Sequence, residues 1–182
     1  MPGPTRADLE AAAGGSVPDV VGHGLDVLFC GINPGLYSAA VGHHFARPGN
    51  RFWKALHLAG FTDRVRDAAD DGDLPSVGLG ITNLVDRATA RASELSDAEL
   101  RAGSAVLSAK AARLEPRAVA VLGIGAYRAA FARSRGALGL QQARLGPAIL
   151  WVLPNPSGLN ARFQLPELAE AFAALREAVG MR

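Results

Sequence analysis

Two short apolar runs that each end in an asparagine-proline loop most constrain how this chain can fold. The first run, Leu25 to Cys30, leads into Gly31-Ile32-Asn33-Pro34-Gly35, and the second, Ile149 to Leu153, leads into Pro154-Asn155-Pro156-Ser157-Gly158-Leu159-Asn160. Short apolar runs bounded by turn residues predict buried strands. Two such strands that end at the same edge of a sheet would bring their loops together as a pocket with a polar floor.

Helical patterns separate these and other predicted strands. We expect strands at residues 27–30, 80–85, 118–122 and 149–153, with 140–145 pairing with the last of them. Capping residues and helical spacing predict helices after Asn50, after Ser96 and from about Pro166. Strands alternating with helices predict an α/β layered fold with a mostly parallel sheet. Right-handed crossovers then place the carboxyl ends of the strands at one edge, where such sheets bind ligands.

The chain has 182 residues, a length that suits one domain with a sizeable core. We predict an N-terminal arm or short helix at residues 1–24 and a single domain at residues 25–182. No apolar run approaches the ~20 residues that span a bilayer, and no signal-peptide pattern is present at the start of the sequence. We therefore expect a cytoplasmic protein without a membrane partner. A net charge of +2 neither demands nor excludes nucleic acid.

Several residues invite a metal or cofactor hypothesis without supporting it. One cysteine, Cys30, permits neither an internal disulfide nor a cysteine-ligated zinc site. The neighbouring His43 and His44 lack the spacing and the carboxylate partners of a metal site. The run Gly123-Ile124-Gly125 lacks the third glycine of a dinucleotide fingerprint. We expect no cofactor and no metal.

The side chains in the predicted loops suggest how the pocket could act. Asn33 is a poor general base because it carries no charge, but its amide can hold a water molecule. Phe45 lies in a long loop that we expect from Gly31 to Gly49, where an aromatic ring can stack on a planar ligand. Leu159 is an apolar residue among polar neighbours and could wedge between base pairs. The simpler alternatives are that Asn33 makes a turn, that Phe45 fills the core and that Leu159 points inward.

Three motifs in the same order resemble the mismatch-specific uracil-DNA glycosylases, which are bacterial relatives of thymine-DNA glycosylase in the uracil-DNA glycosylase superfamily. The similarity runs from about Leu25 to Val179. The motifs are Gly31-Ile32-Asn33-Pro34-Gly35, Phe45-Ala46-Arg47-Pro48-Gly49-Asn50-Arg51-Phe52-Trp53 and Asn155-Pro156-Ser157-Gly158-Leu159. The resemblance implies a three-layer α/β/α sandwich with a central, mostly parallel sheet of about four or five strands.

The resemblance also implies an activity. The protein would be a monofunctional DNA glycosylase of base excision repair, acting as a monomer on double-stranded DNA at the nucleoid. It would flip uracil, or a related mispaired or damaged base opposite guanine, out of the duplex and hydrolyse its N-glycosidic bond. Asn33 would position the water, Phe45 would stack on the base, and Leu159 would fill the vacated stack. The other implied contacts are backbone contacts to the base by Gly31 and Ile32, the second active-site motif beginning at Asn155, and Gly158 facing the widowed guanine.

The sequence departs from related enzymes at informative positions. Fast uracil enzymes of the superfamily carry aspartate in the first motif and histidine in the second, whereas Asn33 and Asn155 stand here. We therefore predict slow chemistry in which amide donors stabilise the leaving group. The basic residue that often lies two positions beyond the wedge is Ala161 here, so Arg162 is the candidate for that DNA contact. Asn83, which is lysine in some relatives, is a possible accessory residue, as are Asp86 and Ser157.

Other interpretations remain open from the sequence. Asp86 could instead form a salt bridge to Arg87 or accept a hydrogen bond in a turn. The protein could be a non-catalytic mismatch-binding or damage-binding protein, or a nucleotide-binding α/β protein. The preferred base could be uracil, thymine, ethenocytosine or a hypoxanthine-like lesion. Candidates for phosphate contacts are the basic residues in or after the loops, namely Arg47, Arg51, Lys54, Arg87, Arg91 and Arg162.

Overall fold

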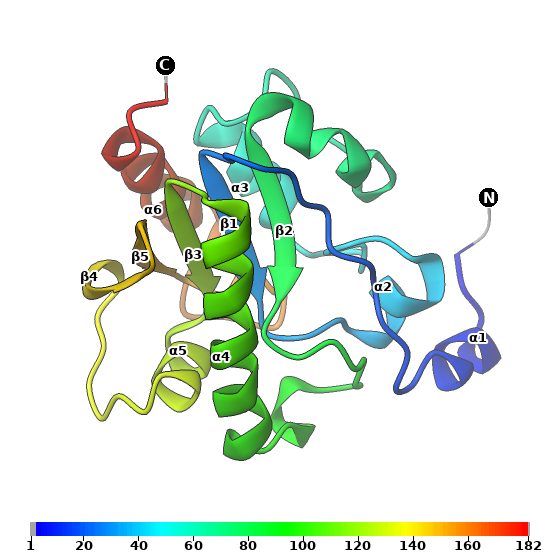
Figure 1. Cartoon of the computed structure of the whole chain (residues 1–182). Coiled ribbons are helices and arrows are strands. Elements are labelled where there is room, and N and C mark those ends of the chain that lie inside the picture. Colours follow the sequence, from blue (N-terminus) through cyan, green and yellow to red (C-terminus); the bar gives the residue numbers. More distant parts are fainter. Residues whose placement is uncertain (1–2, 182) are drawn as a thin grey trace.

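A five-stranded sheet with helices on both faces forms the centre of the computed structural model, which describes residues 3–181 (Figure 1). The strand order is β2-β1-β3-β5-β4, and only β4 runs antiparallel to its neighbour. This arrangement confirms the predicted α/β fold with a mostly parallel sheet. The strands are β1 (Val27–Gly31), β2 (Leu79–Asn83), β3 (Ala118–Leu122), β4 (Gly139–Leu145) and β5 (Ala148–Leu153).

The helices begin largely where the sequence places capping residues. At the start of α4, Ser96 Oγ accepts from the Glu99 backbone nitrogen at 3.2 Å, and the Glu99 side chain accepts from the Ser96 backbone nitrogen at 2.9 Å. This is the predicted capping box. The helices are α1 (Arg6–Ala11), α2 (Leu36–Val41), α3 (Phe52–Leu58), α4 (Asp97–Leu114), α5 (Ile124–Ala130) and α6 (Leu165–Ala178), with 3-10 helices η1 (Ala68–Val77) and η2 (Ala92–Glu94).

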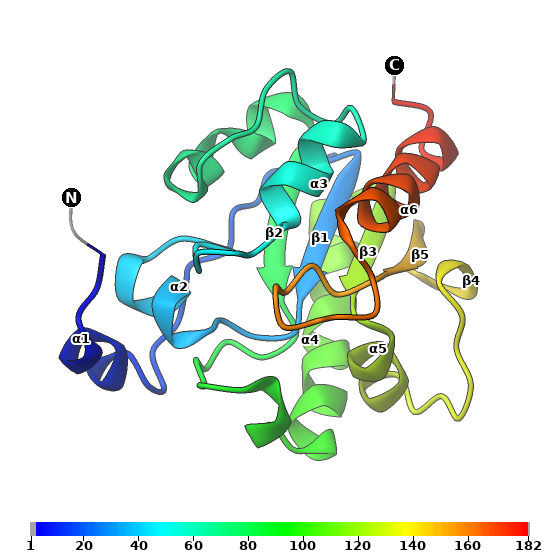
Figure 2. The same cartoon turned by 180° about the vertical axis from the view of Figure 1, so that it is seen from behind.

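Two hydrophobic layers hold the sheet between its helices. On one face, Phe29 of β1 packs edge-on against Phe52 of α3 and stacks with Phe172 of α6, with ring centroids 5.3 and 5.7 Å apart. On the other face, Leu28 and Cys30 of the same strand pack with α4 and α5. Figures 1 and 2 show these helix pairs on opposite sides of the sheet. Every residue of β1, β2 and β3 is buried, as expected for strands covered on both faces.

The N-terminal arm packs against the same sheet. Val20 and Ile81 exchange two backbone hydrogen bonds of 2.9 and 2.7 Å, so the arm pairs with the outer edge of β2. Asp19 accepts from Lys110 Nζ at 2.7 Å and from Thr82 Oγ1 at 2.7 Å. The arm thereby covers a sheet edge that would otherwise be open. Residues 1 and 2 of the predicted arm, and residue 182, lie outside the described residues.

The carboxyl ends of the four parallel strands meet at one edge of the sheet. The segment after β5, residues 154–164, crosses in front of the ends of β1 and β3 in Figure 2. The loop predicted after β1 is interrupted by α2, which is flanked by the capping residues Gly35 and Gly42, the latter with a φ of 76°. Within the described residues, no helix has the length and apolar character needed to cross a membrane.

Candidate active site

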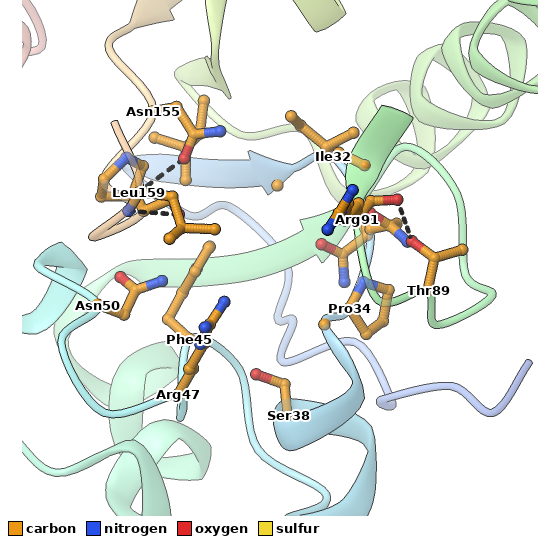
Figure 3. Close-up of a pocket in the computed structure, with 18 of the residues that line it drawn as sticks. Ile32, Pro34, Ser38, Phe45, Arg47, Asn50, Thr89, Arg91, Asn155 and Leu159 are labelled. Atoms are coloured by element: carbon orange, nitrogen blue, oxygen red, sulfur yellow. Dashed lines mark hydrogen bonds between the residues drawn. The ribbon is translucent and has the colours of Figure 1, made fainter. Parts of the chain in front are cut away.

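A cavity of about 380 Å³ opens at this edge, between the loops that follow β1, β2 and β5 (Figure 3). Its volume lies in the range of small-molecule sites. The cavity brings together residues separated by more than a hundred positions in the chain. Apart from the candidate phosphate contacts, the residues predicted from sequence that line it are Gly31, Ile32, Asn33, Phe45, Asn83, Asn155, Ser157 and Leu159.

Asn33 is held in one orientation by the loop after β2. Its side-chain nitrogen donates to Arg87 O at 2.9 Å and to Thr89 Oγ1 at 2.8 Å. Both amide protons are therefore used, and the side-chain oxygen makes no hydrogen bond to any residue of the described chain. An acceptor oxygen at the cavity wall is suited to hold a water molecule.

The loops that follow β1 and β2 are joined along their backbones. Leu84 N donates to Gly31 O at 2.9 Å, Val85 N to Ile32 O at 3.0 Å, and Thr89 N to Pro34 O at 3.2 Å. These bonds continue the pairing of the two strands beyond the sheet. Asn33 therefore lies on a supported backbone rather than on a free loop.

Because Gly31 has no side chain, the Phe45 ring and the Asn83 carboxamide can both lie close to its backbone. A Cβ atom at this position would lie 2.5 Å from Asn83 Oδ1 and 3.4 Å from the Phe45 ring. Asn83 is only 6% exposed, yet its side chain makes no hydrogen bond to the rest of the described chain. Its carboxamide can therefore pair with the polar edge of a planar ligand.

Phe45 projects into the cavity from a strained backbone (Figure 3). Its φ of 53° lies in the left-handed region, which bulky residues rarely adopt. The ring stacks on Phe52 with a centroid distance of 4.2 Å and an interplanar angle of 25°. Strain of this kind persists where the surrounding structure enforces it. One face of the Phe45 ring is thus supported from the core, while the ring lines the cavity.

The adjacent histidines fix the loop that carries Phe45. Asp71, a buried residue of η1, accepts from the His44 backbone nitrogen at 2.9 Å and contacts His43 Nδ1 at 3.0 Å. His44 Nε2 lies 2.9 Å from Pro18 O. Burial lowers the pKa of His44, against smaller opposing effects of Pro18 O and Asp71. Across the described residues, no group of three or more His, Cys, Asp or Glu side chains could hold a metal ion.

Asn155 presents a hydrogen-bond donor from the second loop. Its side-chain oxygen accepts from Ser157 N at 2.9 Å, and its backbone oxygen accepts from Asn160 Nδ2 at 3.0 Å. Its side-chain nitrogen has no acceptor among residues 3–181. The two asparagines thus have opposite hydrogen-bonding roles at the cavity, since Asn33 offers an acceptor and Asn155 offers a donor.

Leu159 is exposed at the mouth of the cavity, and the inward alternative for this residue is wrong. Its relative exposure is 73%, the largest among the exposed large apolar residues. Its backbone nitrogen donates to Ser157 Oγ at 3.3 Å, and Asn160 N donates to Ser157 O at 3.0 Å. A Cβ atom on Gly158 would lie 2.6 Å from Gly49 O. The tight turn therefore rests against the segment that follows Phe45.

Three residues predicted for the site do not line this cavity. Gly158 belongs to the turn and packs against Gly49. Arg162 is exposed, covers the Phe163 ring at 5.6 Å, and lines an adjacent cavity of about 240 Å³. Asp86 is exposed and outside the lining. The alternative salt bridge from Asp86 to Arg87 is wrong, because Arg87 pairs with Glu99 at 2.7 Å.

Four of the six basic residues proposed for phosphate contacts form two groups, and the other two, Lys54 and Arg162, are exposed and do not line the cavity. The guanidinium groups of Arg51 and Arg87 are bound within the protein, Arg51 to backbone carbonyls and Arg87 to Glu99. Arg47 and Arg91 line the cavity, and neither takes part in an ion pair within the described residues (Figure 3). These two arginines give the rim of the cavity a positive charge.

Sequence reasoning missed two residues of the site. Thr89 sets the orientation of Asn33, and Ser38 lines the cavity while its hydroxyl oxygen accepts from Ala46 N at 3.1 Å. Neither residue belongs to the motifs of the resemblance. A possible signal for Thr89 was its position shortly after a strand that ends at the site edge.

A family model and a solved structure are similar to this chain. Residues 18–177 match the family model described as the uracil DNA glycosylase superfamily. The fold is similar to the solution NMR structure of a protein from Methanosarcina acetivorans that carries a provisional assignment as a uracil DNA glycosylase. The TM-score is 0.59 at 21% sequence identity, and the match covers 90% of this chain and 97% of the other. The family model spans most of the sequence, and the chain therefore belongs to the uracil DNA glycosylase superfamily.

Proposed function

We propose that this protein is a monofunctional DNA glycosylase that removes uracil, or a related mispaired or damaged base opposite guanine, from duplex DNA. The observation that carries the proposal is that Asn33, Phe45 and Leu159 line one cavity. An amide acceptor can hold a water molecule, an aromatic ring can stack on a flipped base, and an exposed apolar side chain can fill the vacated stack. Membership of the superfamily supports an N-glycosyl hydrolase that acts on DNA.

The cavity suits a pyrimidine that has left the base stack. The base would stack on Phe45, whose ring is supported from behind by Phe52. The side chain of Asn83 would pair with the Watson–Crick edge of the base, and the backbone at Gly31 and Ile32 would contact it closely. Enzymes that flip bases read them by this combination of stacking and hydrogen bonding.

Hydrolysis would replace the bond between sugar and base with a bond to water. As the C1′–N1 bond breaks, its electron pair leaves with the base, and the sugar gains oxocarbenium character. A water molecule held by Asn33 Oδ1 adds to C1′ and releases its proton to solvent, while the base anion takes a proton from water. Asn155 Nδ2 would donate to the departing base. No Asp or Glu lines the cavity among the described residues, so we propose slow chemistry.

The exposed turn that bears Leu159 would insert into the duplex. Leu159 would fill the space left by the flipped base, with Gly158 beside it facing the widowed guanine. Arg162 and the rim arginines Arg47 and Arg91 would contact the DNA backbone. Flipping costs least for a mispaired base, so a preference for mismatches follows in part from that cost. We propose that the protein acts as a monomer in the cytoplasm, at the nucleoid.

A duplex oligonucleotide with one G·U mismatch tests this function. The protein is incubated with the duplex, and half of each sample is treated with alkali before denaturing electrophoresis. A monofunctional glycosylase gives strand breaks only after alkali, because hydrolysis leaves an abasic site. Breaks without alkali would instead indicate a lyase. Tight mismatch binding without breaks would support the non-catalytic alternative and overturn the proposal.

A further inference from the structure

Arg51 makes an unusual set of contacts with the turn that carries Leu159. Its guanidinium group donates to Ser157 O at 2.6 Å and to Asn160 O at 2.9 Å. The same group donates to Phe163 O and, at 3.4 Å, to Pro156 O. The Arg51 backbone nitrogen also donates to Pro156 O at 3.0 Å. One arginine thus binds four carbonyl groups within a single loop.

In these contacts the carbonyl groups of the loop surround the planar guanidinium group of Arg51. A guanidinium group is planar and presents five N–H donors in a fixed arrangement, so it can hold several carbonyls at set angles. The side chain of Asn160 adds a bond across the loop to Asn155 O at 3.0 Å. A carbonyl that loses its partner in a partly buried place costs more than the bond itself contributes. The loop shape therefore depends on the arginine.

Arg51 also connects the segment that carries Phe45 with the turn that carries Leu159. It lies six residues after Phe45, at the start of α3, where Asn50 Oδ1 accepts from Phe52 N at 2.9 Å. Gly49, in the same segment, is the residue against which Gly158 rests. The ring that lines the cavity and the turn that bears Leu159 are therefore anchored to one short stretch of chain.

We propose that Arg51 is a positioning residue that shapes the Leu159 turn for entry into the duplex before DNA binds. The inference rests on the proposed function. It also assigns Arg51 a role different from the phosphate contact expected from the sequence, because its donors are directed at the loop. A phosphate contact would act on affinity for any DNA, whereas this role acts through the shape of the turn that bears Leu159.

The experiment compares Arg51→Met, which removes the donors, with Arg51→Lys, which keeps the charge without the planar fork. Arg113→Met, on the exposed surface of α4, is the matched control for loss of one arginine. Each substitution is made in the parent protein and in Leu159→Ala. Excision under single-turnover conditions is measured on the G·U duplex and on the same uracil strand without its complement.

We expect Arg51→Met to slow excision from the duplex by about tenfold, a loss of about 1.4 kcal/mol in transition-state stabilisation. Arg51→Lys should retain part of the rate, and Arg113→Met all of it. Neither Arg51 substitution should slow excision further in the Leu159→Ala protein or on the single strand. The salt dependence of duplex binding should stay unchanged, whereas loss of a phosphate contact lowers its slope by about one. Equal losses in both backgrounds, or a lower slope, would overturn the inference.

Limited digestion with trypsin tests the loop without relying on activity. Arg162 lies in the loop and is exposed, so a loosened loop should be cut there faster in Arg51→Met and Arg51→Lys than in the parent. Cleavage at the parental rate in a folded Arg51→Lys protein would overturn the inference. If Arg51→Met does not fold, Arg51→Lys carries both measurements. A parent protein that excises no base contradicts the proposed function, and the digestion still tests whether Arg51 holds the loop in shape.

Discussion

The hydrogen bond from Asn33 Nδ2 to Thr89 Oγ1, 2.8 Å long, determines which atom of the Asn33 amide remains for a ligand. The Thr89 hydroxyl donates its own proton to Arg91 O at 2.8 Å, so it can only accept from Asn33. The amide nitrogen is thereby committed, and the oxygen is left as an acceptor. A neutral threonine outside the sequence motifs thus prepares the proposed water-holding group.

Replacing Thr89 with valine should slow excision without weakening duplex binding. The change keeps the shape of this buried residue but leaves one proton of Asn33 and the carbonyl of Arg91 without a partner. A lost hydrogen bond of about 1 kcal/mol corresponds to a fall in rate of about fivefold. Single-turnover excision from a G·U duplex measures the effect. Thr89→Ser keeps the hydroxyl and serves as the control, and an equal loss in both variants would contradict the explanation.

Replacing Leu159 with alanine should affect duplex and single-stranded substrates differently. The side chain is 73% exposed, so its removal should change stability by no more than about 0.5 kcal/mol. Excision from the duplex should fall by about tenfold or more, since flipping from a stack costs a few kcal/mol that the wedge offsets. Excision from a single strand should change little. Parallel losses on both substrates would argue against a wedge.

Replacing Gly31 with alanine should block the cavity while leaving the protein folded. The new methyl group would lie 2.5 Å from Asn83 Oδ1 and 3.4 Å from the Phe45 ring, so one of them must move. We expect duplex binding to persist and excision to fall by at least about tenfold, because the base can no longer seat against both side chains. Gly72→Ala, whose methyl group meets nothing within 4 Å, is the matched control. Full activity of Gly31→Ala would remove this surface from base recognition.

The burial of His44 predicts that the protein loses stability in mildly acidic solution. The pKa of His44 is lowered from its ordinary value of 6.5, chiefly by burial, so the unfolded chain binds a proton more readily than the folded protein. The contribution of His44 is therefore complete above about pH 6.5 and is lost as the pH falls below it. Thermal unfolding at a series of pH values should show a smaller decline in His44→Gln than in the parent. His23→Gln, at a mostly exposed position, should follow the parent.

Much of the fold could be predicted because its signals are local. The apolar run at 118–122 matches β3, and the Ser96–Glu99 pair marks the start of α4. Residues 36–41 were expected to be loop, but they form α2. A helix of six residues is not stable alone, and this one packs against α1, another short helix. Its existence depends on contacts that neighbouring residues do not reveal.

The residues of the site that belong to the sequence motifs could be predicted. The residues that hold them in place through contacts distant in the sequence could not. Asn33, Phe45 and Asn155 line the expected cavity. Arg51 looked like a surface cation, because its carbonyl partners lie 105 to 112 residues further along the chain. Asp71 lies in the acidic run Asp70-Asp71-Gly72-Asp73, a composition typical of an exposed loop, although Asp71 is buried and accepts from the His44 backbone nitrogen. Long-range partners of this kind become visible only once the chain is folded.

The most direct test is a crystal structure of the Asn33→Ala protein bound to a duplex with one G·U mismatch. This variant should bind the mismatch without excising the base. The account predicts an intact uridine outside the stack, with its ring on Phe45, the Asn83 carboxamide at its edge, and Leu159 in the gap beside the unpaired guanine. A uracil that remains stacked in the helix, or a Leu159 turn directed away from the DNA, would contradict it.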